Sequence, residues 1–192
     1  AGDSTELSFS GPGSRMIWYP LKSSFRAGYA DDDEWDSDNI GTNSVVFGDS
    51  NLADEYGTTI IGGKGNAVSG RGRVIVGGFS NIIESNSEFN VIVGGGSSYG
   101  GGNSISDSAT YSTILGGYSN AIDGANYSSI IGGSNNTISG DNSVAIGSDI
   151  TIEHNNTIIF SDGYEPRSSS GDNQFLIYAT GNVGISAAPL ED

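Results

Sequence analysis

Few side chains in this sequence have the types and spacing that chemistry requires. An acidic run occupies residues 31–34, and Asp36 follows close behind. Calcium prefers several oxygen ligands, so Asp31, Asp33 and Asp36 form a weak candidate site for Ca²⁺. The run lacks the regular spacing and the glycine of an EF-hand loop. A solvated acidic loop is therefore the preferred interpretation, and we expect no cofactor.

Catalytic groups are equally sparse. Glu153 precedes His154, the only histidine, and such a pair suits acid–base work, but no motif places a serine or cysteine nucleophile beside it. The acidic turns single out no carboxylate pair for glycan cleavage. Residues 62–65 resemble a phosphate-binding loop only superficially, because the full spacing and the Ser or Thr after Lys64 are missing. We therefore predict that the chain is not an enzyme.

Aromatic residues fall at recurring positions. Three of them precede the third residue of an apolar triplet by four positions, which predicts one stacked column, and two others follow a Gly-Gly pair, which predicts a second. A further tyrosine lies in an enlarged turn at residues 94–102. Exposed aromatic columns can stack on sugar rings; the alternative is that the rings pack over corners and stiffen them. The candidate receptor-binding residues are Phe89, Tyr111 and Tyr127 of the first column, Phe79 and Tyr118 of the second, and Tyr99 of the turn.

An internal repeat provides the framework for these residues. Eight apolar triplets, most followed by glycine, recur, and their third position advances by 14, 15, 17, 22, 16, 15 and 14 residues from Phe47 to Phe160. This period is typical of a solenoid and too short for pairs of helices. A second, weaker strand lies between most triplets, so each coil is expected to hold two short strands joined by turns. Asparagines that open the second strands should form a ladder, each amide bonded to the next: Asn66, Asn81, Asn103, Asn120 and Asn136.

The two strands of each coil differ, because side chains alternate between the faces of a strand. The second strand has one apolar column, whereas the first has two, which begin at Val46 and Phe47. A thin coil has a single interior, so one of these columns must lie outside as a stripe roughly 35–40 Å long, which soluble monomers rarely leave uncovered. We expect other copies of the chain to cover it; a thicker monomeric helix with a third sheet is the alternative. The residues assigned to the subunit interface or the roll core are Val46, Ile60, Ile75, Ile92, Ile114, Ile130, Ile146 and Ile159.

The charge excludes several classes of partner. The chain has 23 Asp and Glu residues against 7 Lys and Arg, a net charge of −16. Such a surface repels phosphate backbones and anionic bilayers, so neither nucleic acid nor membrane insertion is expected. The absence of cysteine excludes disulfides and thiolate metal sites. Many acidic residues with only two lysines also suit work in high salt, which makes a halophilic or marine source a hypothesis.

Two segments carry a family resemblance. Residues 142–147 (NSVAIG) resemble the signature of the YadA-like heads of trimeric autotransporter adhesins, and residues 43–48 (NSVVFG) are a near copy. The resemblance covers about residues 43–163 and implies a homotrimeric left-handed parallel β-roll. Irregular coil length and the Gly-Gly pairs depart from that family. Residues 181–186 (GNVGIS) are similar to the segment that leads into an endosialidase-type chaperone, and residues 15–41 are similar to a cap found before such repeats in phage tail and other surface proteins.

The expected organisation is all-β, with coils of about 14–17 residues. Residues 1–42 are predicted to form an N-terminal cap, residues 43–163 the β-roll, and residues 164–192 a β-hairpin neck. The expected function is host attachment by a trimeric virus tail fibre, located in the virion, whose partners are itself, other virion proteins and a host-surface glycan or protein. A cellular adhesin or filament subunit at the cell surface is the main alternative. A glycan-cleaving tailspike is a third.

Overall fold

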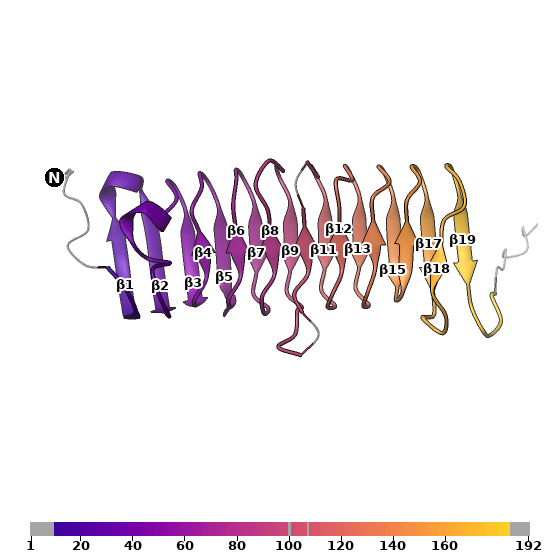
Figure 1. Cartoon of the computed structure of the whole chain (residues 1–192), viewed down its shortest axis with the longest axis horizontal. Coiled ribbons are helices and arrows are strands. Elements are labelled where there is room, and N and C mark those ends of the chain that lie inside the picture. Colours follow the sequence, from indigo (N-terminus) through magenta and orange to yellow (C-terminus); the bar gives the residue numbers. More distant parts are fainter. Residues whose placement is uncertain (1–9, 100, 107, 185–192) are drawn as a thin grey trace, which may run out of the picture.

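The computed structural model describes residues 10–99, 101–106 and 108–184. In them the chain forms a rod of stacked coils, with a hairpin at the N-terminal end and strand β19 at the other (Figure 1). Most coils contribute one strand to each of two sheets, and successive coils pair in parallel. The chain is therefore an all-β parallel solenoid, as the repeat predicted.

The larger sheet follows the order of the chain and has eleven strands in the described residues. All neighbours in it are parallel except the first pair, β1 and β2, which are antiparallel. Its strands are β1 (Gly13–Tyr19), β2 (Ser24–Ala30), β3 (Val45–Asp49), β5 (Thr59–Lys64), β7 (Val74–Val76), β9 (Val91–Val93), β11 (Thr113–Leu115), β13 (Ser129–Ile131), β15 (Val144–Gly147), β17 (Ile158–Ser161) and β19 (Phe175–Tyr178).

The smaller sheet lies opposite and has eight strands among the described residues. Most of them are two residues long, because turns begin directly on either side. The strands are β4 (Leu52–Ala53), β6 (Ala67–Val68), β8 (Ile82–Ile83), β10 (Ser104–Ile105), β12 (Ala121–Ile122), β14 (Thr137–Ile138), β16 (Ile150–Ile152) and β18 (Arg167–Ser168). Two short 3-10 helices, η1 (Pro20–Lys22) and η2 (Ser37–Asn39), belong to the N-terminal cap.

The core is a narrow double row of aliphatic side chains between the sheets. The larger sheet contributes the middle residue of each triplet, fully buried: Val46, Ile60, Ile75, Ile92, Ile114, Ile130, Ala145 and Ile159. The smaller sheet contributes the facing row, which is also buried: Ala53, Val68, Ile83, Ile105, Ile122, Ile138 and Ile152. The middle column thus forms the core, which decides the question that the sequence left open. Ile146 differs from the other residues assigned with it, because Ala145 holds the inward position and Ile146 points outward, partly exposed.

A buried asparagine ladder runs along one corner and confirms the predicted one. Each side-chain Nδ2 donates to the Oδ1 of the preceding asparagine over 2.9–3.1 Å. The same Oδ1 atoms accept the backbone N–H of the next coil. The ladder begins one coil earlier than predicted, at Asn51, and ends where Ile150 donates its N–H to Asn136. Because these amides bond across coils, they fix the register of successive turns.

A second ladder, of hydroxyl groups, lies at the opposite corner and was not predicted. The backbone N–H of Ser128 donates to Ser112 Oγ, that of Ser143 to Ser128 Oγ, and that of Thr157 to Ser143 Oγ, over 3.1–3.2 Å. Each of these residues directly precedes an apolar triplet and is buried. Strands β11 and β13 therefore have buried polar side chains of a ladder at both ends.

The N-terminal cap closes the roll with a small core of its own. Trp35 and Tyr19 are buried there beside Ile17 and Ile40. Arg26 is also buried and donates to the carbonyl oxygen of Ala53 over 2.6 Å. Burial lowers the pKa of Arg26 to about 10, although the charge of Asp54 acts in the opposite direction. The cap therefore ends the solenoid with aromatic bulk and one buried cation.

The roll extends past residue 163, where the sequence predicted it to end and a hairpin neck to begin; the second strand of that hairpin, from Val183 on, lies almost wholly outside the described residues, which end at Gly184. Strand β18 pairs in parallel with β16, and β19 pairs in parallel with β17, so the solenoid continues beyond residue 163. Leu176 and Tyr178 pack against the roll core. The physical reason is that the edge of β17 is open to a further parallel strand. In residues 175–178 every second side chain is directed toward the core, so Leu176 and Tyr178 extend it. Ile185 and the residues after it lie outside the described part of the chain.

The Gly-Gly pairs mark the closest approach between coils. In the pair Gly116-Gly117 both residues have positive φ, 74° and 79°. A Cβ at Gly117 would lie 1.9 Å from the carbonyl oxygen of Gly133, whereas one at Gly116 would lie 3.7 Å from its nearest neighbour. The first glycine is therefore needed for the turn alone, and the second for the turn and for coil contact.

This difference gives a prediction with a built-in control. Both Gly116→Ala and Gly117→Ala incur the cost of a left-handed backbone, about 1–2 kcal/mol. Gly117→Ala also forces neighbouring coils apart and should lower the free energy of unfolding by about 1–3 kcal/mol more. Denaturant unfolding followed by circular dichroism measures both variants. Equal losses would show that the coils do not touch at Gly117.

Candidate functional site

The outer face of the larger sheet carries a long apolar column in the described residues. The third residue of most triplets is 37–50% exposed, while the middle residue is buried. We call these third residues the outer column; its exposed members are Phe47, Ile61, Val76, Val93, Leu115, Ile131 and Phe160. The outward face of the smaller sheet instead carries small or polar residues at most positions, such as Ala121 and Thr137. One side of the rod is therefore apolar along its length.

The predicted aromatic column, Phe89, Tyr111 and Tyr127, forms at one edge of the larger sheet. The ring centroids of Phe89 and Tyr111 are 5.2 Å apart with planes at 15°, and those of Tyr111 and Tyr127 are 5.1 Å apart at 6°. Their exposed fractions are 50%, 52% and 60%. The rings stack on one another, so their inner faces are mutually covered, yet each residue remains half exposed or more.

The backbone of the aromatic column is unusual for its residue types. Phe89, Tyr111 and Tyr127 have φ of 56°, 55° and 54°, in the left-handed region. Bulky side chains rarely occupy that region, whereas Gly and Asn do so often. The other coils place such residues at the same position, with similar φ: Asn43, Gly57 and Gly72 before the column, and Asn142, Asn156 and Asn173 after it. The column thus replaces the usual turn residue in three successive coils.

A polar row lies beside this column, because each of its members directly precedes a column residue. We call it the corner row: Glu88, Thr110, Asn126, Asp141, Asn155 and Asp172. Its side-chain oxygens accept backbone N–H groups of the preceding coil: Asp141 from Asn126 over 2.7 Å and Asn155 from Asp141 over 2.8 Å. The row contains carboxylates, amides and the hydroxyl of Thr110, and Arg71 holds the same position one coil before Glu88.

The remaining aromatic candidates lie at the opposite edge of the larger sheet. Phe79 and Tyr118 share a position in their coils, but Gly96 occupies it in the coil between them, and no ring contact joins the two within the described residues. Tyr99 is fully exposed on a hairpin in which Ser97 and Gly101 pair through two 3.0 Å hydrogen bonds. The six candidates therefore divide between two edges and do not form one surface.

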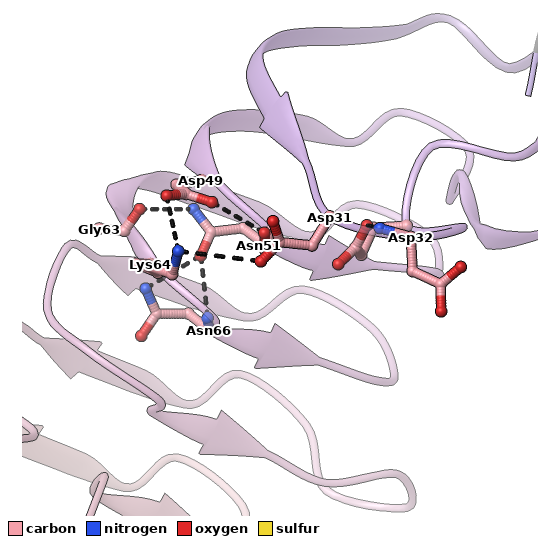
Figure 2. Close-up of polar contacts among 9 residues, drawn as sticks. Asp31, Asp32, Asp49, Asn51, Gly63, Lys64 and Asn66 are labelled. Carbon is pink, nitrogen blue, oxygen red and sulfur yellow. Dashed lines mark hydrogen bonds and ion pairs between the residues drawn. The ribbon is translucent and has the colours of Figure 1, made fainter. Parts of the chain in front are cut away.

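Lys64, in the segment that superficially resembled a phosphate loop, is held by carboxylates (Figure 2). Its Nζ lies 3.0 Å from Asp49 Oδ2 and 3.8 Å from Asp31 Oδ2. The hydrogen bond from Lys64, with one from Ser50, holds the pKa of Asp49 below its usual value, and Asp49 in turn raises the pKa of Lys64. These side chains tie the acidic run to the second coil.

The structure disperses the calcium candidates. Asp31 faces Lys64, and Asp36 accepts the backbone N–H of Gly11 over 2.7 Å. The exposed Asp33 uses its backbone carbonyl to accept from Asn39. No group of three or more carboxylate, histidine or cysteine side chains converges in the described residues.

His154 has a partner that the sequence did not reveal. Its Nδ1 lies 2.7 Å from Ser169 Oγ, which also accepts the backbone N–H of Glu153. The contact joins the last coils. A general base beside a nucleophile needs a third group that orients its ring. In the described residues no carboxylate forms a hydrogen bond to the His154 imidazole.

The dispersed carboxylates predict indifference to calcium. Adding millimolar Ca²⁺, or removing it with a chelator, should leave the melting temperature unchanged, because a ligand stabilises only when it binds the folded state. Differential scanning calorimetry at constant ionic strength, with Mg²⁺ as the control ion, provides the measurement. A rise of several degrees with Ca²⁺ alone would contradict this prediction.

Comparison with known proteins yielded no relative. No family model, curated protein or solved structure matched the chain. No helix in the described residues is long and apolar enough to cross a membrane. The functional assignment consequently depends on two features of the rod: the outer column and the aromatic corner.

Proposed function

We propose that this chain is a segment of a homotrimeric attachment fibre, a left-handed β-roll that belongs to a virus tail fibre and contacts the host surface. The observation that supports it best is the outer column. The eight triplet strands, at about 4.8 Å each, extend this apolar face over roughly 35–40 Å. Soluble monomers seldom expose so continuous a patch.

Self-association would explain why the outer column is apolar, because each copy would bury it against the others. Burial of about 400 Å² of apolar surface per chain would contribute on the order of 10 kcal/mol. Three copies around one axis would each bury this face while the aromatic corners and the Tyr99 hairpin stay outside. Three identical binding edges on one rod would also raise the strength of individually weak contacts.

The charge of the chain supports a fibre that contacts other surfaces selectively. With a net charge of −16, the rod repels nucleic acids and anionic bilayers. We therefore propose the chain itself, other virion proteins and a host glycan or protein as partners. The proposal includes no catalytic step.

A cellular adhesin or filament subunit has the same architecture and remains the second candidate. Both roles need a trimeric rod with exposed binding edges. They differ in location, at the virion or at the cell surface. A glycan-cleaving tailspike is a weaker candidate because it requires a carboxylate pair between subunits.

The assembly can be tested on the outer column. Ile131→Asp places a charge in the centre of the proposed interface and should convert the trimer to monomers, because an unpaired buried charge costs several kcal/mol. Thr137→Asp, on the outward face of the smaller sheet, is the matched control and should leave the trimer intact. Size-exclusion chromatography with light scattering reads the mass of each. A mass that is the same for both variants would exclude this face as the interface.

The location can be tested separately. Antibodies raised against the chain should label fibres on virus particles in immunogold electron microscopy of the source sample. Labelling of cell envelopes instead would reject the virion assignment and favour the adhesin.

A further inference from the structure

We propose that the aromatic column and the asparagines that follow it form a binding site for a neutral saccharide. This inference rests on the proposed attachment function and names the chemistry of its ligand. Three bulky aromatic residues hold the left-handed backbone that other coils give to Asn or Gly, and a residue kept in a costly conformation is a sign of function.

Stability alone does not explain the aromatic column. A left-handed backbone costs a bulky residue about 1–2 kcal/mol, and three successive coils bear that cost. Two stacked ring pairs return about 0.5–1.5 kcal/mol each. Three such residues cost about 3–6 kcal/mol together, whereas the two ring pairs return about 1–3 kcal/mol, so ring stacking does not offset the backbone cost that Asn or Gly avoids in other coils. A role in binding accounts for what packing does not.

The column is open at one end only. Toward the N-terminus the ring of Phe89 lies against Gly72, where an added Cβ would be 3.1 Å from a ring carbon. Toward the C-terminus Tyr127 stacks on Tyr111 alone, and the next position is taken by the exposed Asn142. A flat ring placed over Asn142 would continue the stack on the last face of Tyr127. Aromatic faces carry negative charge density, which attracts the polarised C–H groups of a sugar ring.

The next two coils supply polar groups in the direction that a longer ligand would take. Asn156 and Asn173 are exposed in the same column, and Asn156 Nδ2 donates to Asn173 Oδ1 over 3.2 Å. That bond leaves Asn156 Oδ1 and Asn173 Nδ2 available for ligand hydroxyl groups. Asp141, in the adjacent corner row, engages the protein through Oδ1. Apolar contact with a few convergent polar groups is typical of ligand sites.

The charges at this corner select among saccharides. Asp141 and Asp172 lie in the corner row at and beyond the open end of the aromatic column, whereas Arg71 holds the equivalent position one coil before Glu88, at the closed end. Sialylated, uronic or sulfated glycans would be repelled by the row and by the net charge of −16. The site therefore suits neutral hexoses or N-acetylhexosamines.

Tyr127→Asn is the decisive variant, because Asn occupies this position in the next three coils and tolerates the backbone. Tyr164→Asn, at another highly exposed tyrosine, is the matched control. Saturation-transfer NMR on the full chain would use tetrasaccharides of glucose, galactose and N-acetylglucosamine, and sialylated and sulfated glycans of equal length. Thermal melting would follow each variant.

We expect at least one neutral tetrasaccharide to bind the parent chain and the Tyr164→Asn variant, with binding at least tenfold weaker to Tyr127→Asn and an unchanged melting temperature. Binding of none of the neutral probes, equal binding by Tyr127→Asn, or a preference for acidic glycans would overturn the inference. A large fall in the melting temperature of Tyr127→Asn would also overturn it, by assigning the column to stability. If light scattering still shows a trimer and antibodies still label fibres, the attachment proposal survives the loss of this site.

Discussion

The structure depends on one geometric constraint: the strands of the larger sheet are apolar on both faces, and a coil of two short strands can enclose only one of them. The middle residue of each triplet fills the core, with Ile92 and Ile114 fully buried, and the third residue, such as Val93 or Leu115, stays outside. A conventional monomer would place polar residues there. The outward face of the smaller sheet, where Ala121 and Thr137 lie, shows that this chain can do so. The apolar outer column is therefore a property of one face, and it supports assembly.

Stacking at strand spacing also governs the corners of the rod. Coils this close need a glycine such as Gly117 where backbones meet, and they bring identical side chains within bonding distance. The asparagine and hydroxyl ladders at opposite corners both exploit that spacing. The aromatic column is a third ladder, but its members occupy a backbone conformation that suits Asn and Gly better. Two ladders therefore stabilise the rod, and for the third we propose contact with a ligand.

The sequence revealed much of this because repeats turn spacing into geometry. Triplet spacing predicted the solenoid but left open which triplet column forms its core. The recurring Asn predicted the asparagine ladder, although Asn51 was missed. The hydroxyl ladder was not predicted, because a Ser such as Ser128 before a strand resembles any turn residue. The last coil was not assigned to the roll, because residues 175–178 are not followed by the glycine that ends most triplets. The spacing of the aromatic residues predicted the aromatic column. Its backbone cost could also have been inferred from the sequence, because Asn142 holds the position of Tyr127 one coil later and Asn is typical of a left-handed turn. The meeting of His154 and Ser169 depends on coil stacking at the end of the roll, which no local pattern encodes.

In the proposed trimer, buried outer columns and three exposed aromatic corners would suit a fibre that holds binding surfaces away from its base. The proposed fibre requires that other copies of the same chain cover the outer column. Sedimentation equilibrium of the unmodified chain at micromolar concentration tests this directly. We expect a single trimeric species with three times the 19.7 kDa mass of the chain, independent of concentration over that range. A stable monomer of 19.7 kDa that remains folded and soluble would contradict it.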